Sequence, residues 1–61
     1  MSRAAILAMA EAIRKADSWT WDVLDMLRLL SIEAGIDPEK YSEPFWLAID
    51  VQNALGVDLG E

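Results

Sequence analysis

The sequence predicts an all-α fold, a small three-helix bundle that assembles as a helical homodimer. Three segments, residues 2–16, 20–34 and 43–55, repeat apolar residues at helical spacing, and polar or glycine-containing stretches separate them. The 61 residues allow one domain, and a chain of this length buries only about 60% of its extended surface. Because 24 residues have large hydrophobic side chains, a bundle of this size cannot cover them all. The surplus predicts self-association.

The first helix, residues 2–16, is expected to begin at Ser2, whose side chain can cap the free backbone N–H groups. Arg14 and Lys15 lie in its last turn, where positive charge suits the helix dipole. The apolar residues of this segment share one face: Ile6, Met9, Ile13 and Ala16.

The second helix, residues 20–34, has a clear start and a clear end. Thr20 is the predicted N-cap, and Asp22 and Asp25 place negative charge near the helix start. Gly35 at C′ and Ile36 at C″ predict a Schellman ending.

Apolar residues occur on two sides of this second helix. Val23, Leu27, Leu30 and Ala34 form one stripe, which is sufficient for a three-helix core. Trp21, Leu29 and Ile32 lie on the reverse side among charged residues. A helix that is apolar on nearly every side is buried on nearly every side. We therefore expect a second copy of the chain to cover the reverse side; the alternative is a central helix covered by both neighbours.

Residues 35–42 form a polar connector with a single turn that Asp37 caps and Pro38 begins. Ser42 is the predicted N-cap of the third helix, residues 43–55, with Pro44 in the first turn. Gly56 is expected to end this helix, and residues 57–61 to form a short, frayed tail.

The third helix also has two faces. Leu47, Ala48, Val51 and Leu55 share one side, and the other carries aromatic and polar residues. Exposed aromatic rings among polar groups are typical of binding hot spots, although they could instead pack under the connector or against the first helix. The predicted partner-binding residues are Phe45, Trp46, Ile49 and Asp50. The predicted core consists of Ile6, Met9, Ile13, Val23, Leu27, Leu30, Leu47, Val51 and Leu55.

The composition argues against most catalytic chemistry. The chain has no His and no Cys, which excludes disulfides, thiolate nucleophiles, zinc sites and His-containing triads. Its carboxylates, hydroxyls and two lysines follow no recognisable catalytic or calcium-binding pattern. We expect neither enzymatic activity nor a metal or other cofactor.

The formal net charge of −6 is unevenly distributed. Residues 1–18 carry three basic and two acidic side chains, a net charge of +1, whereas residues 19–61 carry two basic and nine acidic ones, a net charge of −7. An acidic surface attracts basic partners and repels phosphate backbones, so direct binding of nucleic acid is not expected. The long connector and a third helix without Lys or Arg also disfavour a helix-turn-helix regulator.

No apolar stretch approaches the roughly 18 residues that a membrane span requires. A short apolar run after Arg3, ending in Ala8-Met9-Ala10, resembles a signal peptide only at its minimum length. We expect a cytoplasmic protein without a membrane contact.

Three functions fit these features. The first is a homodimeric protein-interaction module that binds and modulates a protein partner. The second is an acidic inhibitor of a nucleic-acid-handling enzyme, with carboxylates in place of phosphates, comparable in size and charge to small phage anti-defence proteins. The third is a structural subunit of a larger complex.

Overall fold

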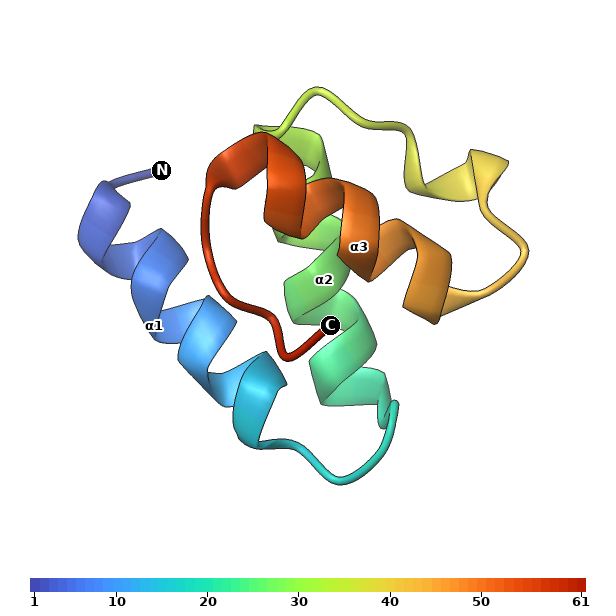
Figure 1. Ribbon diagram of the computed structural model, residues 1–61, viewed down its shortest axis with the longest axis horizontal. Helices are drawn as coiled ribbons and strands as arrows, with labels where there is room; N and C mark the ends of the chain where they lie inside the picture. The colour runs from blue at the N-terminus through green and yellow to red at the C-terminus, as the bar shows by residue number, and fades with distance from the viewer.

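The computed structural model describes all residues 1–61 and contains three α-helices and no strand (Figure 1). The helices are α1 (Arg3–Lys15), α2 (Trp21–Glu33) and α3 (Pro44–Leu55), and a single 3₁₀ turn, η1 (Pro38–Lys40), lies in the connector. α2 contacts both of the other helices, and the C-terminal segment runs back between α1 and α3 (Figure 1). The predicted all-helical class is therefore confirmed.

The predicted caps of the first two helices are present. Ser2 Oγ accepts a hydrogen bond from the backbone N–H of Ala5 at 3.1 Å, and Thr20 Oγ1 accepts one from Val23 at 3.5 Å. At the end of α2, Gly35 adopts φ +74°. The N–H of Ile36 then reaches the carbonyl of Ser31 at 2.9 Å, which completes the predicted Schellman ending.

The predicted cap of α3 is wrong. The N-cap residue is Glu43, which makes no side-chain capping bond, and the helix begins at Pro44. A proline disfavours helical geometry in the residue before it, and Glu43 is accordingly extended, with φ −136° and ψ 143°. The helix therefore starts one residue too late for Ser42 to cap it. The predicted cap of the connector turn does form, because Asp37 accepts a bond from the N–H of Glu39 at 3.0 Å.

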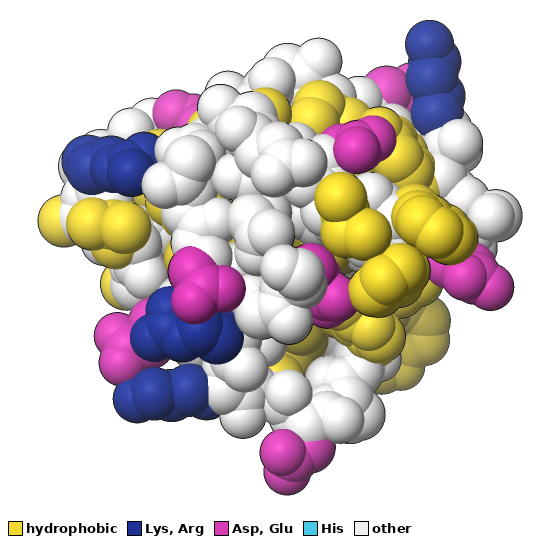
Figure 2. All heavy atoms as spheres, viewed as in Figure 1, with side chains coloured by type: hydrophobic (Ala, Val, Ile, Leu, Met, Phe, Trp, Pro, Cys, Tyr) yellow, Lys and Arg dark blue, Asp and Glu magenta, His cyan; other side chains and the backbone are white.

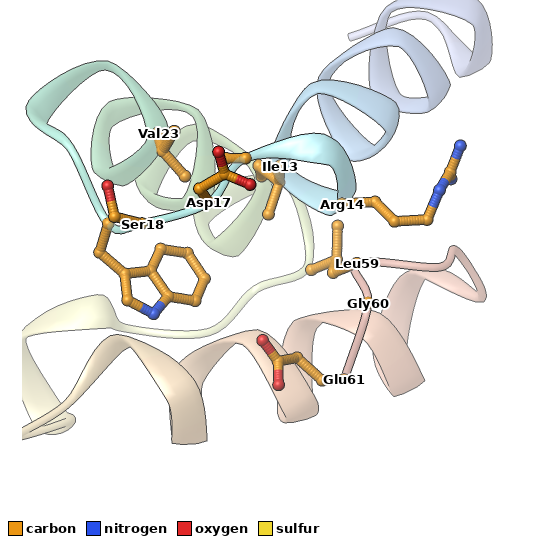
Figure 3. A pocket seen from close by; sticks show the side chains of 10 residues that line it. Ile13, Arg14, Asp17, Ser18, Val23, Leu59, Gly60 and Glu61 are labelled. Atoms are coloured by element: carbon orange, nitrogen blue, oxygen red, sulfur yellow. The ribbon is translucent and has the colours of Figure 1, made fainter.

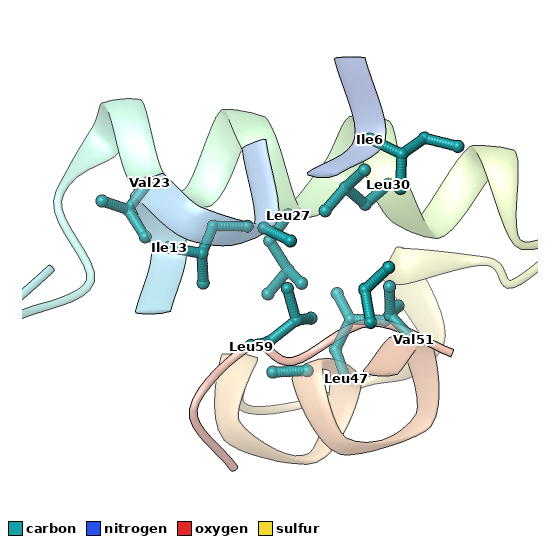
Figure 4. Packing of buried hydrophobic residues seen from close by; sticks show 11 residues of the cluster. Ile6, Ile13, Val23, Leu27, Leu30, Leu47, Val51 and Leu59 are labelled. Carbon is teal, nitrogen blue, oxygen red and sulfur yellow. The ribbon is translucent and has the colours of Figure 1, made fainter. Parts of the chain in front are cut away.

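The hydrophobic core draws on all three helices and the C-terminal segment (Figure 4). Met9 and Leu55 are only half-buried, which corrects their predicted place in the core. Ile6, Ala10 and Ile13 form the inward stripe of α1, and Met9 lies at its edge. The buried hydrophobic residues are Ile6, Ala10, Ile13, Val23, Leu27, Leu30, Leu47, Ala48, Val51, Val57 and Leu59.

The expectation of a frayed tail is also wrong. Leu59 is only 2% exposed and lies among core side chains of α1, α2 and α3 (Figure 4). Gln52 holds the segment: its Oε1 accepts the N–H groups of Leu59 at 2.9 Å and Glu61 at 3.3 Å, and its Nε2 donates to the carbonyl of Glu61 at 3.0 Å. A fully buried Leu contributes about 1.5–3 kcal/mol through burial, which explains why the tail is part of the fold.

Arg3 joins the first helix to the last. Its Nη1 donates to the carbonyl of Leu55 at 2.9 Å and its Nη2 to that of Gly56 at 3.4 Å. These carbonyls are at the end of α3, where helix geometry leaves acceptors free and the helix dipole favours positive charge. Arg3 thus caps the C-terminal end of α3 through a carbonyl that is 52 residues away in sequence.

Candidate interaction surfaces

Several large hydrophobic side chains remain exposed after the core has formed. Most of them belong to the outward sides of α2 and α3, and the others are Met1 and Leu7. Because a monomer rarely exposes large apolar side chains in groups without a use for them, these two sides are the candidate interaction surfaces. The exposed residues on them are Trp21, Leu29, Ile32, Phe45 and Trp46.

The outer face of α2 carries all three residues predicted to mediate self-association. Trp21 is 82% exposed, Ile32 65% and Leu29 47%. Leu29 and Ile32 are three residues apart and so are neighbours on the helix surface, whereas Trp21 lies about 16 Å from Ile32 along the helix axis. α2 contacts both other helices, but this face remains open to solvent. The structure therefore leaves one compact apolar pair and one separate indole ring.

The outer face of α3 carries a pair of aromatic rings. Phe45 and Trp46 contact each other edge to face, with ring centroids 5.0 Å apart and planes at 73°. Both rings are exposed, and Ile49 is half-buried beside them at helical spacing. Figure 2 shows hydrophobic side chains gathered over the N-terminal half of α3. Neither ring is buried under the connector or against the first helix, which was the alternative that the sequence left open.

Asp50, the fourth predicted partner-binding residue, is engaged within the chain. The hydroxyl of Tyr41 in the connector donates a hydrogen bond to Asp50 Oδ2. This bond stabilises the neutral phenol and raises the pKa of Tyr41, and desolvation and the negative charge of Asp50 act in the same direction. The pair fastens the connector to α3, so Asp50 is less available to a partner than its exposure suggests.

A cavity of about 220 Å³ lies between α2 and the connector. We call it the connector pocket. Trp21, Asp25 and Arg28 contribute from α2, Tyr41 from the connector, and Glu43 from the N-cap of α3. Leu24, Leu27, Pro38, Ser42, Pro44 and Leu47 complete its lining. Sequence reasoning missed this pocket because it depends on how the connector folds back over α2.

The charges around the connector pocket are not balanced. Arg28 Nη1 forms an ion pair with Glu39 Oε1 at 2.8 Å, so its charge is already compensated. Asp25 and Glu43 form no ion pair within the chain. The pocket therefore offers two uncompensated carboxylates beside two aromatic rings.

A second cavity, of about 210 Å³, lies where the end of α1 meets the following turn and the C-terminal segment (Figure 3). Its charged residues are Arg14, Asp17 and Glu61, and Arg14 extends away from the two carboxylates (Figure 3). Leu59 forms part of its wall, so this cavity also depends on the packed tail that the sequence did not predict.

Comparison with protein-family models, with curated proteins and with solved structures found no match to this chain. No group of three or more acidic side chains is placed to hold a metal ion. None of the helices has the length and hydrophobicity needed to cross a bilayer. Function is therefore inferred from the surfaces of this chain and their chemistry.

Proposed function

We propose that the protein is a non-catalytic interaction module that pairs with a second copy of itself and presents an acidic, aromatic surface to a basic protein partner. The observation that carries the proposal is the exposure of two groups of apolar side chains on different helices after the core has closed. One group, Leu29 and Ile32, would mediate self-association. The other, Phe45, Trp46 and Ile49, would contact the partner.

Self-association through α2 is supported by the chemistry of its outer face. Leu29 and Ile32 form an apolar pair that water must solvate in the monomer, and its burial is worth about 25 cal/mol for each Å² removed from water. Trp21 belongs to the same predicted set, but the structure places it at the edge of the connector pocket. The dimer contact is therefore centred on the C-terminal half of α2.

Partner binding through α3 is supported by ring geometry and charge. Aromatic side chains have few rotatable bonds, so the edge-to-face pair Phe45 and Trp46 presents a large area at small entropic cost, as binding hot spots do. The surrounding residues 19–61 carry a net charge of −7, which would accelerate the approach of a basic partner.

The self-association is tested by the mass in solution of Leu29→Lys and Ile32→Lys, measured by light scattering after size exclusion. We expect each variant to have the monomer mass of 6.8 kDa under conditions where the unmodified chain is a dimer. Circular dichroism should show unchanged helix content, since both side chains lie outside the core.

The matched control is Leu7→Lys. Leu7 is 48% exposed, almost the same as Leu29, but shares the side of α1 with Arg3 and Arg14. It should leave the dimer intact. Equal loss of the dimer in all three variants, or none in any, would contradict the proposed contact.

Phosphate mimicry is the second candidate, and the exposed carboxylates of Asp22 and Asp25, which form no ion pair, favour it. Such an inhibitor would bind its target enzyme through several charges, so binding should weaken steeply with salt and on neutralising these residues together with Asp50. Binding that depends mainly on Phe45 and Trp46 and little on salt would exclude this candidate.

A further inference from the structure

The connector pocket has the size of a site for one side chain. Its volume of about 220 Å³ is below the roughly 300–1,000 Å³ typical of pockets for drug-sized ligands and cofactors. A space of this size can hold one long side chain of a partner. Because it is open to solvent beside the exposed Trp21, a segment of another protein can reach it.

The lining of the pocket selects for positive charge. Asp25 and Glu43 have no cation of their own, and the only cation in the lining, Arg28, is already paired with Glu39. Trp21 and Tyr41 add aromatic rings, and such rings attract ammonium and guanidinium groups and pack against their aliphatic stems. The apolar residues Leu24 and Leu47 suit the methylene groups of the same side chains.

We propose that the connector pocket binds a Lys or Arg side chain from a basic segment of a protein partner. The carboxylates of Asp25 and Glu43 would hold the cationic head, and Trp21 and Tyr41 would contact the rest of the side chain. This inference rests on the proposed function and deepens it, since it names the chemistry of the partner. It also assigns Trp21 to partner binding, which leaves Leu29 and Ile32 as the dimer contact.

The test is an NMR titration of the isotope-labelled protein with a hexa-arginine peptide. We expect saturable shifts at the Trp21 indole and at backbone amides around the pocket. A hexa-citrulline peptide, which has nearly the same shape without the charge, should bind at least tenfold more weakly. Trp21→Ala should weaken binding of hexa-arginine at least threefold, and its fold should be retained because this indole is 82% exposed.

Two double variants distinguish binding at the pocket from general attraction of the peptide to an acidic protein. Asp25→Asn with Glu43→Gln should weaken hexa-arginine binding at least fivefold. Asp17→Asn with Asp58→Asn removes the same charge from carboxylates that form no ion pair and do not line the pocket, and it should have less than a twofold effect. Equal weakening by both pairs, or shifts scattered evenly over the acidic surface, would overturn the site.

Binding of the peptide at the pocket does not depend on self-association of the chain. Leu29→Lys should still bind hexa-arginine at the pocket, and Trp21→Ala should retain the mass of the unmodified chain. If the chain is monomeric but binds the peptide at the pocket, the proposed dimer fails and the site stands. If the chain is dimeric but shows no saturable shifts at the pocket, the site fails and the dimer stands.

Discussion

At the scale of single residues, the bond between Tyr41 and Asp50 can be tested by pH. Because the bond stabilises the neutral phenol, the pKa of Tyr41 lies above its ordinary value of 10.0. The contact therefore contributes its full stability below the pKa of an unfolded tyrosine. This contribution is lost as the pH rises through the raised pKa of the folded state.

We expect Asp50→Ala to lower the pH at which Tyr41 ionises. Tyr41 is the only tyrosine in the chain, so the absorbance of the phenolate reports on it alone. Glu43→Gln, which removes a nearby carboxylate that does not bond to the phenol, should shift the titration less. Identical midpoints for Asp50→Ala and the unmodified chain would show that the bond does not form in solution.

Gln52 is the second residue whose role can be tested by substitution. Its side chain makes three hydrogen bonds that hold the C-terminal segment. We expect Gln52→Ala to lower the free energy of unfolding by about 1–3 kcal/mol, in the range for losing several partly exposed bonds. Urea denaturation measures this loss, and the amide of Leu59 should exchange faster with solvent.

Asn53→Ala is the matched control for Gln52→Ala, because Asn53 is the exposed neighbour on the same helix. It should change the free energy of unfolding by less than about 0.5 kcal/mol. A Leu59 amide that exchanges equally fast in both variants would contradict the role of Gln52.

The residues that the sequence could not place are those whose partners are distant along the chain. Ser2, Thr20 and Gly35 act on backbone groups within a few residues, and their roles were predictable from local rules. Gln52 and Leu59 find their partners only when the chain turns back after Gly56. No local sequence pattern indicates that the chain turns back in this way.

At the scale of elements, Arg3 couples α1 to the C-terminal end of α3. We expect Arg3→Ala to lower the free energy of unfolding by about 1 kcal/mol, the usual size of an exposed charge at a helix end together with its hydrogen bonds. Lys40→Ala, which removes a cation that forms no ion pair, should cost less than about 0.5 kcal/mol. Equal stability losses in urea would contradict this coupling.

The helices themselves could be predicted because apolar spacing and capping residues are local signals. All three lie within one or two residues of the expected ranges. The face of α1 was harder to place, because Met9 and Ala10 differ by one position and hydrophobicity favours the larger residue. Packing favours the smaller one, and Ala10 is buried while Met9 lies at the core's edge.

The candidate surfaces were partly predictable in the same way. Trp21, Leu29 and Ile32 share a face by helical spacing alone, and so do Phe45 and Ile49. The connector pocket was not predictable, because it forms between α2 and a segment whose path depends on Pro38, Pro44 and the bond from Tyr41 to Asp50. The bond from Tyr41 to Asp50 also depends on the path of the connector, so the sequence alone led us to assign Asp50 to a partner.

At the scale of the whole molecule, stability and binding make competing demands on a small number of apolar residues. Eleven hydrophobic residues close a core around α2, and five large ones on α2 and α3 remain outside it. A 61-residue chain without cysteines, and so without disulfides, has little stability in reserve, so association that buries part of this surface would also stabilise the fold. The proposed dimer would thus contribute to the stability of the fold as well as to its function.

The absolute mass of the unmodified chain, measured by sedimentation equilibrium over a wide concentration range, tests the proposed self-association most directly. We expect the mass to rise with concentration from 6.8 kDa towards twice that value and to stop there, because one face on each copy is used. A mass of 6.8 kDa at every concentration would contradict the account, and so would growth beyond the dimer.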